Sequence, residues 1–370
     1  MSERIIVVGG GVMGLATAWQ LVRRGERPIV LERFARGHHE GASHGETRNF
    51  NNAYGDAHYL DLLVRAREGW DALGEVEGEP LLRLHGLVSH GSGMALGSAT
   101  ARGLPTIASE LASRGIPAEI LDGAAAGRRW PGMRFEETVL FSPDAGVARA
   151  AAALRELERR IVGGGGEVRW NTRVRAVAAD ADGASVVTDA ETLRADAVVV
   201  TVGAWTSGLL ADLGIPLPPL RVTEETPAHF TATIAGPWPS FNHFVAPGSQ
   251  PANVYGMPTP GEGVKVGFHG IGDEIDPDRR PHLPVLQREL RDYVREWFPG
   301  LDADTAVPIS CTYTTTPTEA FVLDRVGPLV VGAGFSGQGF KFAPGVGATL
   351  ADLVLDADAR AAEPFRLPRG

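Results

Sequence analysis

Three glycines near the N-terminus have the spacing that a bound dinucleotide requires. Gly9, Gly11 and Gly14 form a G-x-G-x-x-G pattern between a β-branched run, residues 5–8, and a run with helical apolar periodicity, residues 15–24. In such a pattern the first glycine permits a tight turn, the second lets the backbone approach a pyrophosphate, and the third lets the helix pack closely on the strand. The positive end of the helix faces the phosphates.

An acidic residue follows at the distance that this fingerprint needs. Glu32 ends a second predicted strand, residues 28–31, where its carboxylate can bind ribose hydroxyls. The alternative is a glycine-rich turn in an ordinary α/β domain, but such a turn does not explain the acid at the end of the strand. The first 32 residues therefore predict a dinucleotide site.

Lysine is nearly absent from the chain. Of the 35 basic residues only Lys265 and Lys341 are lysines, and all the others are arginine. A compact ammonium that can titrate does different chemistry from a guanidinium, which favours a functional role for both lysines. The alternatives are chance retention of the two under codon bias and, for Lys265, an ordinary solvated position on a strand.

Two predicted strands carry reactive side chains in register. The alternation of a strand places Lys265 and His269 on one face, and in a second strand it places Cys311 and Tyr313 on one face. Cys311 is the only cysteine, which excludes an internal disulfide. The commonest role of a free cysteine is that of a small buried hydrophobe, so that role is the alternative for Cys311.

Two polar, glycine-rich segments contain further candidates. Residues 37–55 lack periodicity and include Ser43, His44, Thr47 and Arg48, whose side chains can face a cofactor or a substrate. For His44 alone, an ordinary loop histidine is the alternative.

The second segment joins a buried strand to a helix near the C-terminus. A strand predicted over residues 328–333 runs into a turn that contains Gly337, Gly339, Phe340 and Lys341. A helix is predicted to start near Pro344, and its N-terminus is suited to negative charge on a ligand, such as a reduced flavin.

Other elements must hold these residues in one place. Helices are predicted over 59–73 and 148–161, and strands over 86–88, 167–170, 174–177 and 197–202. From residue 216 to about 316, proline, aromatic residues and short β runs indicate an antiparallel sheet. We therefore predict an α/β fold with a discontinuous Rossmann-like nucleotide domain (1–81, 146–215 and 317–370) and a second, mainly antiparallel-sheet (α+β) substrate domain (82–145 and 216–316).

The composition limits the functional classes. The 370 residues are 44% hydrophobic and 22% charged, as in soluble globular proteins. The net charge of -10 and the absence of a basic run argue against nucleic acid as a partner, and no apolar stretch is long enough to cross a membrane. The N-terminal apolar run matches the nucleotide turn rather than a signal peptide, and the lone cysteine fits a reducing compartment, so we expect a cytoplasmic protein.

Taken together, these motifs resemble the monomeric sarcosine oxidase and N-methyltryptophan oxidase family, within the D-amino-acid-oxidase-like flavoproteins. The resemblance covers nearly the whole chain, and its most specific segments are residues 311–314 and 334–342. The other matching segments, besides the glycine fingerprint, are 43–48, 53–55, 129–132, 203–205, 254–258 and 265–269.

The resemblance implies FAD as the cofactor, bound covalently through a thioether between Cys311 and the flavin 8α carbon. The positions that it implies as cofactor contacts are Gly9, Gly11, Val12, Met13, Gly14, Glu32, Arg33, Ser43, Thr47, Arg48, Val174, Gly203, Cys311, Gly337, Gly339, Phe340 and Lys341.

The resemblance also implies catalytic roles. Lys265 is expected to activate oxygen beside the flavin, and Lys341 to bind the carboxylate of an amino-acid substrate. The other residues that it implies around the flavin ring and the substrate are His44, Arg48, Tyr255, His269 and Tyr313. No metal site is expected.

The implied reaction is oxidation of a secondary amine such as an N-methyl amino acid. A hydride equivalent passes to the flavin, the imine hydrolyses to an aldehyde and an amine, and oxygen reoxidises the flavin to give hydrogen peroxide. The expected partners are therefore a small amine substrate and oxygen, and the expected state is a monomer.

Two positions depart from the family pattern. Asn51 replaces a second arginine that helps to bind the substrate carboxylate, and Gln338 stands where a histidine is common. Losing a charge-assisted hydrogen bond weakens such binding by about 1.5–3 kcal/mol, so either another basic residue substitutes or the substrate differs from sarcosine.

Several alternatives stay open. One is an oxidase of a cyclic imino acid or of a larger N-substituted amino acid, and another is a flavin dehydrogenase that uses an acceptor other than oxygen. A flavin-binding protein without turnover gives no reason for keeping both lysines. A nicotinamide-dependent dehydrogenase explains the N-terminal fingerprint but neither Cys311 nor the turn before Lys341.

Overall fold

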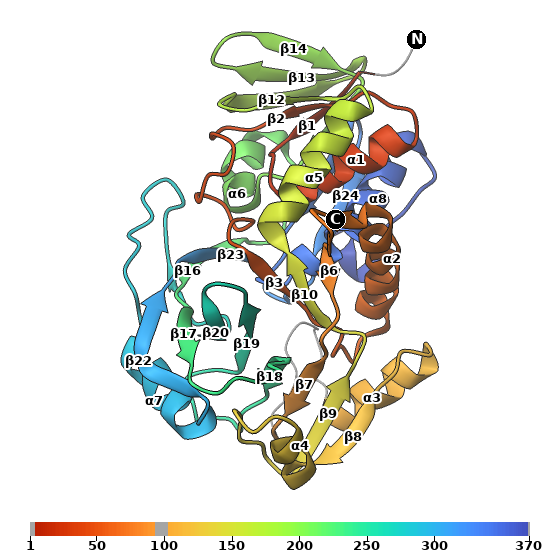
Figure 1. Cartoon of the computed structure of the whole chain (residues 1–370). Helices are drawn as coiled ribbons and strands as arrows, with labels where there is room; N and C mark the ends of the chain where they lie inside the picture. The colour runs from red at the N-terminus through yellow and green to blue at the C-terminus, as the bar shows by residue number, and fades with distance from the viewer. Residues whose placement is uncertain (1–3, 93–102, 369–370) are drawn as a thin grey trace.

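The computed structural model describes residues 4–92 and 103–368 and contains two large sheets at opposite ends of the molecule (Figure 1). The first has six strands, parallel except for its last, antiparallel edge strand. In spatial order they are β11 (Glu167–Arg169), β2 (Ile29–Leu31), β1 (Ile5–Val8), β15 (Ala197–Val200), β25 (Leu329–Ala333) and β24 (Val322–Val326).

Both faces of this sheet are covered, as its β-branched strands predict. In β1, Ile5 and Val7 belong to the hydrophobic core on one face, and Ile6 and Val8 to the core on the other. The elements of the first face are helices α1 (Val12–Arg23), α2 (Ala57–Leu73), α5 (Ala150–Gly163) and α8 (Ala343–Leu355). Those of the second are β12 (Val174–Asp180), β13 (Gly183–Thr188) and β14 (Thr192–Ala195).

The second large sheet has eight strands and is antiparallel except at one pair, β18 and β7. Its order is β22 (Leu301–Pro308), β17 (Ala228–Ala232), β20 (Gly263–Phe268), β19 (Val254–Thr259), β18 (Ser240–His243), β7 (Leu87–His90), β9 (Thr138–Ser142) and β8 (Glu119–Asp122). Helix α7 (Gln287–Trp297) packs against it through Leu290, Tyr293 and Val294.

Two small antiparallel sheets lie between the large ones (Figure 1). One contains β3 (Thr47–Phe50), β10 (Gly146–Arg149) and β6 (Leu82–Arg83), and the other contains β21 (Asp273–Glu274), β16 (Arg221–Glu225) and β23 (Cys311–Thr315). The remaining elements are α3 (Leu104–Ser113), α4 (Gly123–Arg129), α6 (Thr206–Leu210), the β4–β5 hairpin (Glu75–Val76, Glu79–Pro80) and 3-10 turns at Gly203–Trp205, Ala211–Leu213, Phe340–Phe342 and Glu363–Phe365.

The predicted fold class is confirmed, with local differences. The helix expected from residue 148 starts at Ala150, because residues 146–149 pair with β3 as strand β10. The segment expected to be a loop over 37–55 contains that β3 strand. Residues 216–316 divide their strands between two sheets rather than one.

The turn between β1 and α1 depends on two glycines. Gly9 has a φ of +103°, and a Cβ added to Gly14 would lie 1.9 Å from the carbonyl oxygen of Gly9. A positive φ of this size is accessible to glycine but rarely to other residues. The short distance at Gly14 shows that the backbone of α1 touches the backbone at the end of β1, with no room for a side chain. This contact fixes the position of the first turn of α1 against the turn that follows β1.

We expect Gly14→Ala to lower the free energy of unfolding by about 1–3 kcal/mol or more, because the added methyl group meets backbone that cannot move aside. Gly127→Ala in α4 is the matched control, since no atom lies within 4 Å of its added Cβ. That variant should be neutral or more stable by up to about 1 kcal/mol. Chemical denaturation measures both, and equal stability of the two variants would contradict the close contact at Gly14.

Candidate active site

A cavity of about 1070 Å³ is lined by residues of both large sheets and of the connecting sheets. It brings together every residue for which a catalytic role was expected. These are His44, Arg48, Tyr255, Lys265, His269, Tyr313 and Lys341.

Most of the expected cofactor contacts line the same cavity. They are Gly9, Gly11, Val12, Met13, Glu32, Arg33, Ser43, Arg48, Val174, Gly203, Cys311, Gly337, Gly339, Phe340 and Lys341. Gly14 and Thr47 lie outside this lining. Gly14 packs on the Gly9 backbone, and the Thr47 hydroxyl lies 2.7 Å from that of Thr259 on β19.

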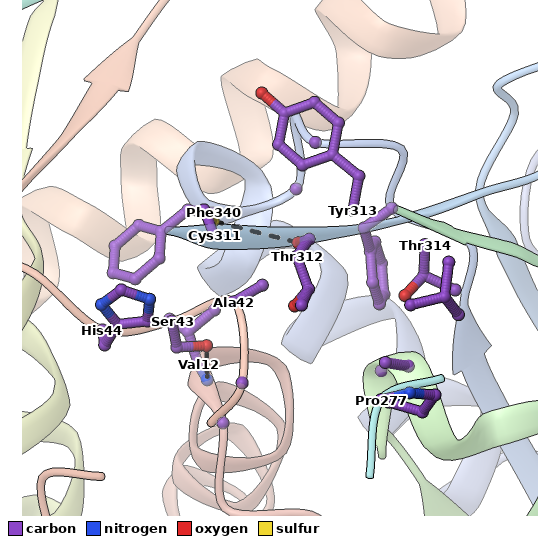
Figure 2. Close-up of a pocket in the computed structure, with 18 of the residues that line it drawn as sticks. Val12, Ala42, Ser43, His44, Pro277, Cys311, Thr312, Tyr313, Thr314 and Phe340 are labelled. Carbon is purple, nitrogen blue, oxygen red and sulfur yellow. Dashed lines mark hydrogen bonds between the residues drawn. The ribbon is translucent and has the colours of Figure 1, made fainter. Parts of the chain in front are cut away.

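The start of α1 offers backbone donors to the cavity. Gly11 is the N-cap of α1 and has no side chain, and Ser43 Oγ accepts the N–H of Val12 at 3.0 Å (Figure 2). Glu32 is buried at the end of β2, where its Oε2 accepts the N–H of Gly10 at 2.7 Å. An open helix N-terminus beside a fixed carboxylate fits the pyrophosphate and ribose of a dinucleotide.

Sequence reasoning missed Asp278, which binds the expected cofactor contact Arg33. Asp278 accepts hydrogen bonds from Arg33 Nη1 at 2.6 Å and Trp205 Nε1 at 2.9 Å, and all three residues line the cavity. Asp278 lies in an irregular segment far along the chain, and the only sequence signal there is a turn of prolines and aspartates around residues 276–281.

Arg48 organises the segment before β3. Its guanidinium donates to the carbonyl oxygens of Thr47 at 2.9 Å, Ala42 at 3.1 Å and His44, and it stacks over the Phe340 ring at 5.8 Å. Burial, followed by the charge of Arg48, lowers the pKa of His44 to about 3, so this imidazole is neutral. Its Nε2 is buried without a hydrogen-bond partner among the described residues, which leaves it available to a ligand.

Both lysines are buried at the cavity wall without a carboxylate partner in the described part of the chain. Lys265 Nζ donates to the Thr47 carbonyl at 3.3 Å, and Lys341 Nζ to the Gln338 carbonyl at 2.8 Å. Burial lowers the pKa of each to about 7, and the charge of Arg48 lowers that of Lys265 further. Two buried amines with pKa values of about 7 gain from a bound negative charge, which favours their protonated form.

Three aromatic side chains add a neutral surface. His269 Nδ1 lies 3.4 Å from the Tyr313 hydroxyl, and the Tyr255 ring packs edge-on at 6.1 Å from that of His269. Burial lowers the pKa of His269 to about 4 and raises the pKa of both phenols, so all three are uncharged at neutral pH.

Cys311 opens β23 and lines the cavity, half-buried. Figure 2 shows Cys311, Thr312, Tyr313 and Thr314 in a row along this strand, with Phe340 and His44 beside its Cys311 end. Its thiol lies 3.9 Å from the Thr312 carbonyl oxygen. The side chain therefore faces the cavity rather than belonging to one of the hydrophobic cores of the described residues.

The two departures from the family pattern are neutral cavity residues. Asn51 Oδ1 accepts the N–H of Ala53 at 2.7 Å, and its amide contacts Asn242 at 3.4 Å. Gln338 Oε1 accepts the Tyr54 hydroxyl at 2.8 Å, while its Nε2 is buried without a partner among the described residues. Neither supplies the second cation that a carboxylate site of this kind is expected to have.

The turn after β25 differs slightly from prediction. A 3-10 turn over Phe340–Phe342 precedes α8, so the helical geometry begins before Pro344. Trp70 Nε1 donates to the Lys341 carbonyl at 2.8 Å and fixes this turn against α2. In the described part of the chain, no group of three His, Cys, Asp or Glu side chains is arranged to hold a metal ion, and no helix combines the length and apolarity needed to cross a membrane.

Comparison with known proteins gives concordant matches. Residues 4–353 match the model of one protein family, DAO, which is described as FAD dependent oxidoreductase. Peroxisomal sarcosine oxidase of Mus musculus is 33% identical over 98% of this chain and 95% of its own length. Monomeric sarcosine oxidase of Bacillus sp. (strain B-0618) is 31% identical, with coverages of 95% and 92%.

A relative with another substrate and two solved structures also match. N-methyl-L-tryptophan oxidase of Salmonella arizonae is 29% identical over 100% of this chain and 99% of its own. NikD, described as an unusual amino acid oxidase essential for nikkomycin biosynthesis, has a TM-score of 0.84 and 29% identity, covering 98% of this chain and 96% of its own. L-proline dehydrogenase from P. horikoshii, at 20% identity, a TM-score of 0.80 and coverages of 98% and 97%, shares the fold.

The burial of Lys341 makes stability depend on pH. Its pKa is about 7 in the folded chain against 10.5 for an unperturbed lysine. Between these values the unfolded chain binds more protons, so stability rises with pH across that window.

Lys341→Met removes the buried charge, and in the flavin-free chain we expect its Tm at pH 6 to exceed the parent's by on the order of 5 °C. The difference should shrink toward pH 10, where the parent lysine is neutral when folded. Arg288→Met is the control, because that side chain is 91% exposed and should change Tm little at either pH. Calorimetry that found a constant difference at both pH values would contradict the burial of a titrating charge.

Proposed function

We propose that this chain, which belongs to the FAD-dependent oxidoreductase family, oxidises secondary amines to imines and passes the electrons to oxygen, releasing hydrogen peroxide. N-methyl amino acids are the preferred substrate class. The family inferred from the sequence motifs is confirmed by the family match and by the sarcosine oxidases at about 30% identity. The observation that supports the proposed activity best is one cavity that joins a dinucleotide cradle, a free thiol and two buried ammonium groups.

The residues of the cavity fit FAD. The open first turn of α1 and the fixed Glu32 carboxylate suit its adenosine diphosphate part, and the cavity continues from there to Cys311 and Lys265. When bound, FAD supplies the two-electron acceptor that none of the side chains can provide. We propose that Cys311 holds the flavin through a thioether, and that Arg48 and His44 lie beside its ring.

Lys341 would bind the substrate carboxylate. Its ammonium is buried and has only a backbone carbonyl as a hydrogen-bond partner in the described structure, so an incoming carboxylate gains a charge-assisted bond without displacing an ion pair. Because Lys341, Lys265 and Arg48 all line the cavity, a substrate ammonium is disfavoured there. The site therefore favours the neutral amine, which is the form that can lose a hydride from its carbon.

The neutral aromatic residues would orient the amine. Tyr255, His269 and Tyr313 present hydrogen-bonding groups that stay uncharged at neutral pH. They can hold the reacting N–C bond in one orientation and exclude water, which supplies much of the rate in such reactions. Lys265 then stabilises the negative charge that develops on oxygen as it is reduced.

Asn51 favours a second candidate substrate class. Without the expected second cation, the site binds the carboxylate of sarcosine less strongly, and larger N-substituted or cyclic amino acids can compensate through apolar contacts. A dehydrogenase that uses another acceptor is the less favoured alternative, because Lys265 is kept at the cavity.

We also propose that the protein is a cytoplasmic monomer and that it has the two domains predicted from the sequence.

Peroxide release from the purified flavoprotein across a panel of amines tests the function. The panel contains sarcosine, larger N-methyl amino acids, proline, pipecolate, primary amino acids and amines without a carboxylate. We expect peroxide from secondary amines with a carboxylate, and their relative rates give the size of the pocket. Turnover only of amines without a carboxylate would overturn the role of Lys341, and reduction of the flavin without peroxide would favour the dehydrogenase.

Lys265→Met should slow reoxidation by oxygen about 100-fold or more, because a buried charge at the reacting oxygen is lost. The rate of anaerobic flavin reduction by substrate should change less than about tenfold. Lys265→Arg keeps a positive charge, so its rate of reoxidation by oxygen should lie between those of the parent and of Lys265→Met. Stopped-flow spectroscopy of the flavin measures both half-reactions. If both slow equally, Lys265 does not have the proposed role.

A further inference from the structure

A buried ion pair lies next to the start of the strand that carries Cys311. The side chains of Arg280 and Glu224 are each 3% exposed, and Arg280 Nε lies 3.1 Å from Glu224 Oε1. Both also bond to Ser310, the residue before Cys311. Arg280 Nε and Nη2 donate to Ser310 Oγ at 3.0 and 2.7 Å, and this hydroxyl donates to Glu224 Oε1.

The same arginine reaches the segment on the other side of the cavity. Arg280 Nη1 donates to the carbonyl oxygens of His39 and Glu40, at 3.1 Å each. The segment that follows these two residues contains Ser43 and His44, which line the cavity. One guanidinium thus connects β16, the start of β23 and the segment that leads to α1's cap.

Strand register places Glu224 on the side of β23 opposite the thiol, whereas Arg280 and Ser310 line the cavity beside it. Glu224 pairs with Thr312 across β16 and β23, and Glu225 pairs with Cys311. Since directly paired residues share a face and successive residues alternate, Glu224 supports the strand from behind while the Cys311 side chain points the other way. The cluster can therefore fix the backbone of Cys311 through its neighbour Ser310 and from the opposite face of the strand through Glu224.

A contribution to folding stability does not by itself explain the buried pair of Arg280 and Glu224. A buried ion pair pays a desolvation cost that often equals its attraction, so apolar residues of similar volume would hold the fold as well. A planar guanidinium with five donors does something that apolar residues cannot do, because it fixes the mutual geometry of several chain segments at once.

We propose that Arg280, held in place by Glu224, is a positioning residue that sets Cys311 against the segment containing residues 39–44, and so controls covalent attachment of the flavin. This inference rests on the proposed thioether. Attachment forms a bond between Cys311 Sγ and the 8α carbon, with loss of the thiol proton and of one hydrogen from that carbon. The two electrons released stay on the flavin until dioxygen accepts them with two protons and leaves as hydrogen peroxide.

The test measures attachment directly. The full chain, produced without flavin, is mixed with FAD in air, and the fraction of flavin that stays in the acid-precipitated pellet is followed over time. Arg280→Met should attach flavin at least about tenfold more slowly than the parent, because several charge-assisted hydrogen bonds are lost. Glu224→Gln, which removes the partner charge, should also be slower than the parent, and Cys311→Ala should retain no flavin.

Arg279→Met is the matched control. It removes the same charge from the neighbouring residue, whose side chain is 86% exposed and lies 3.9 Å from Asp276. This variant should attach flavin at the parent rate. Parent-like attachment by a folded Arg280→Met would overturn the proposal, and if that variant does not fold, Arg280→Lys should show an intermediate rate, with a parent-like rate again overturning it.

A second readout separates this inference from the proposed function. Cys311 is the only cysteine, so the alkylation rate of the flavin-free chain reports the position of this thiol alone. We expect Arg280→Met to change that rate at least about threefold and Arg279→Met to leave it unchanged. If the parent releases all its flavin into the acid supernatant, the thioether is wrong. Equal alkylation in the parent and Arg280→Met would show that Arg280 does not position Cys311.

Discussion

The backbone carbonyl of Thr47 joins the two sides of the cavity. It accepts hydrogen bonds from Arg48 Nη1 at 2.9 Å and from Lys265 Nζ at 3.3 Å, which belong to β3 and to the eight-stranded sheet. The Thr47 hydroxyl bonds to Thr259 of β19 in the same region. The position of Lys265 relative to the segment that leads into β3 therefore depends on where β3 lies, and β3 is fixed by its pairing with β10.

Sharing one carbonyl brings two cations close together, and this has a chemical effect. The charge of Arg48 adds to burial in lowering the pKa of Lys265 to about 7. A lysine with such a pKa can hold or release a proton near neutrality, whereas the guanidinium beside it keeps its charge. The site thus combines a permanent positive charge with one that responds to a bound anion.

The sequence predicts the parts of this site that depend on local pattern. The glycine spacing, the β-branched strands and the alternation within β20 and β23 predict the elements that carry Gly9, Lys265 and Cys311, because period and turn chemistry are local properties. That these residues meet in one cavity is implied only by the resemblance to a known family. Pairings between distant strands have no such local signal, and the parallel pair of β18 and β7, which joins residues about 150 positions apart, is an example.

Contacts between distant irregular segments could not be predicted in this way. Asp278 binds Arg33 across 245 positions, and Arg280 reaches His39 across 241. Their side chains come from a proline-containing segment without periodicity, so only the folded chain shows that they meet. Local motifs thus identify only part of the cavity, because Asp278 and Arg280, which also line it, are found only from tertiary contacts.

The order of strands in the six-stranded sheet has a consequence for synthesis of the chain. Strands β1, β15 and β25 come from the beginning, the middle and the end of the sequence. β1 and β25 each have one partner that is close in sequence, β2 and β24, whereas β15 pairs only with β1 and β25, which both lie far from it along the chain. A nascent chain that has not yet reached residue 329 leaves β15 with an open, apolar edge, which is a template for association with other chains. The pairing of β15 with β25 therefore waits until residues 329–333 have been synthesised, and a non-local pairing of this kind forms slowly.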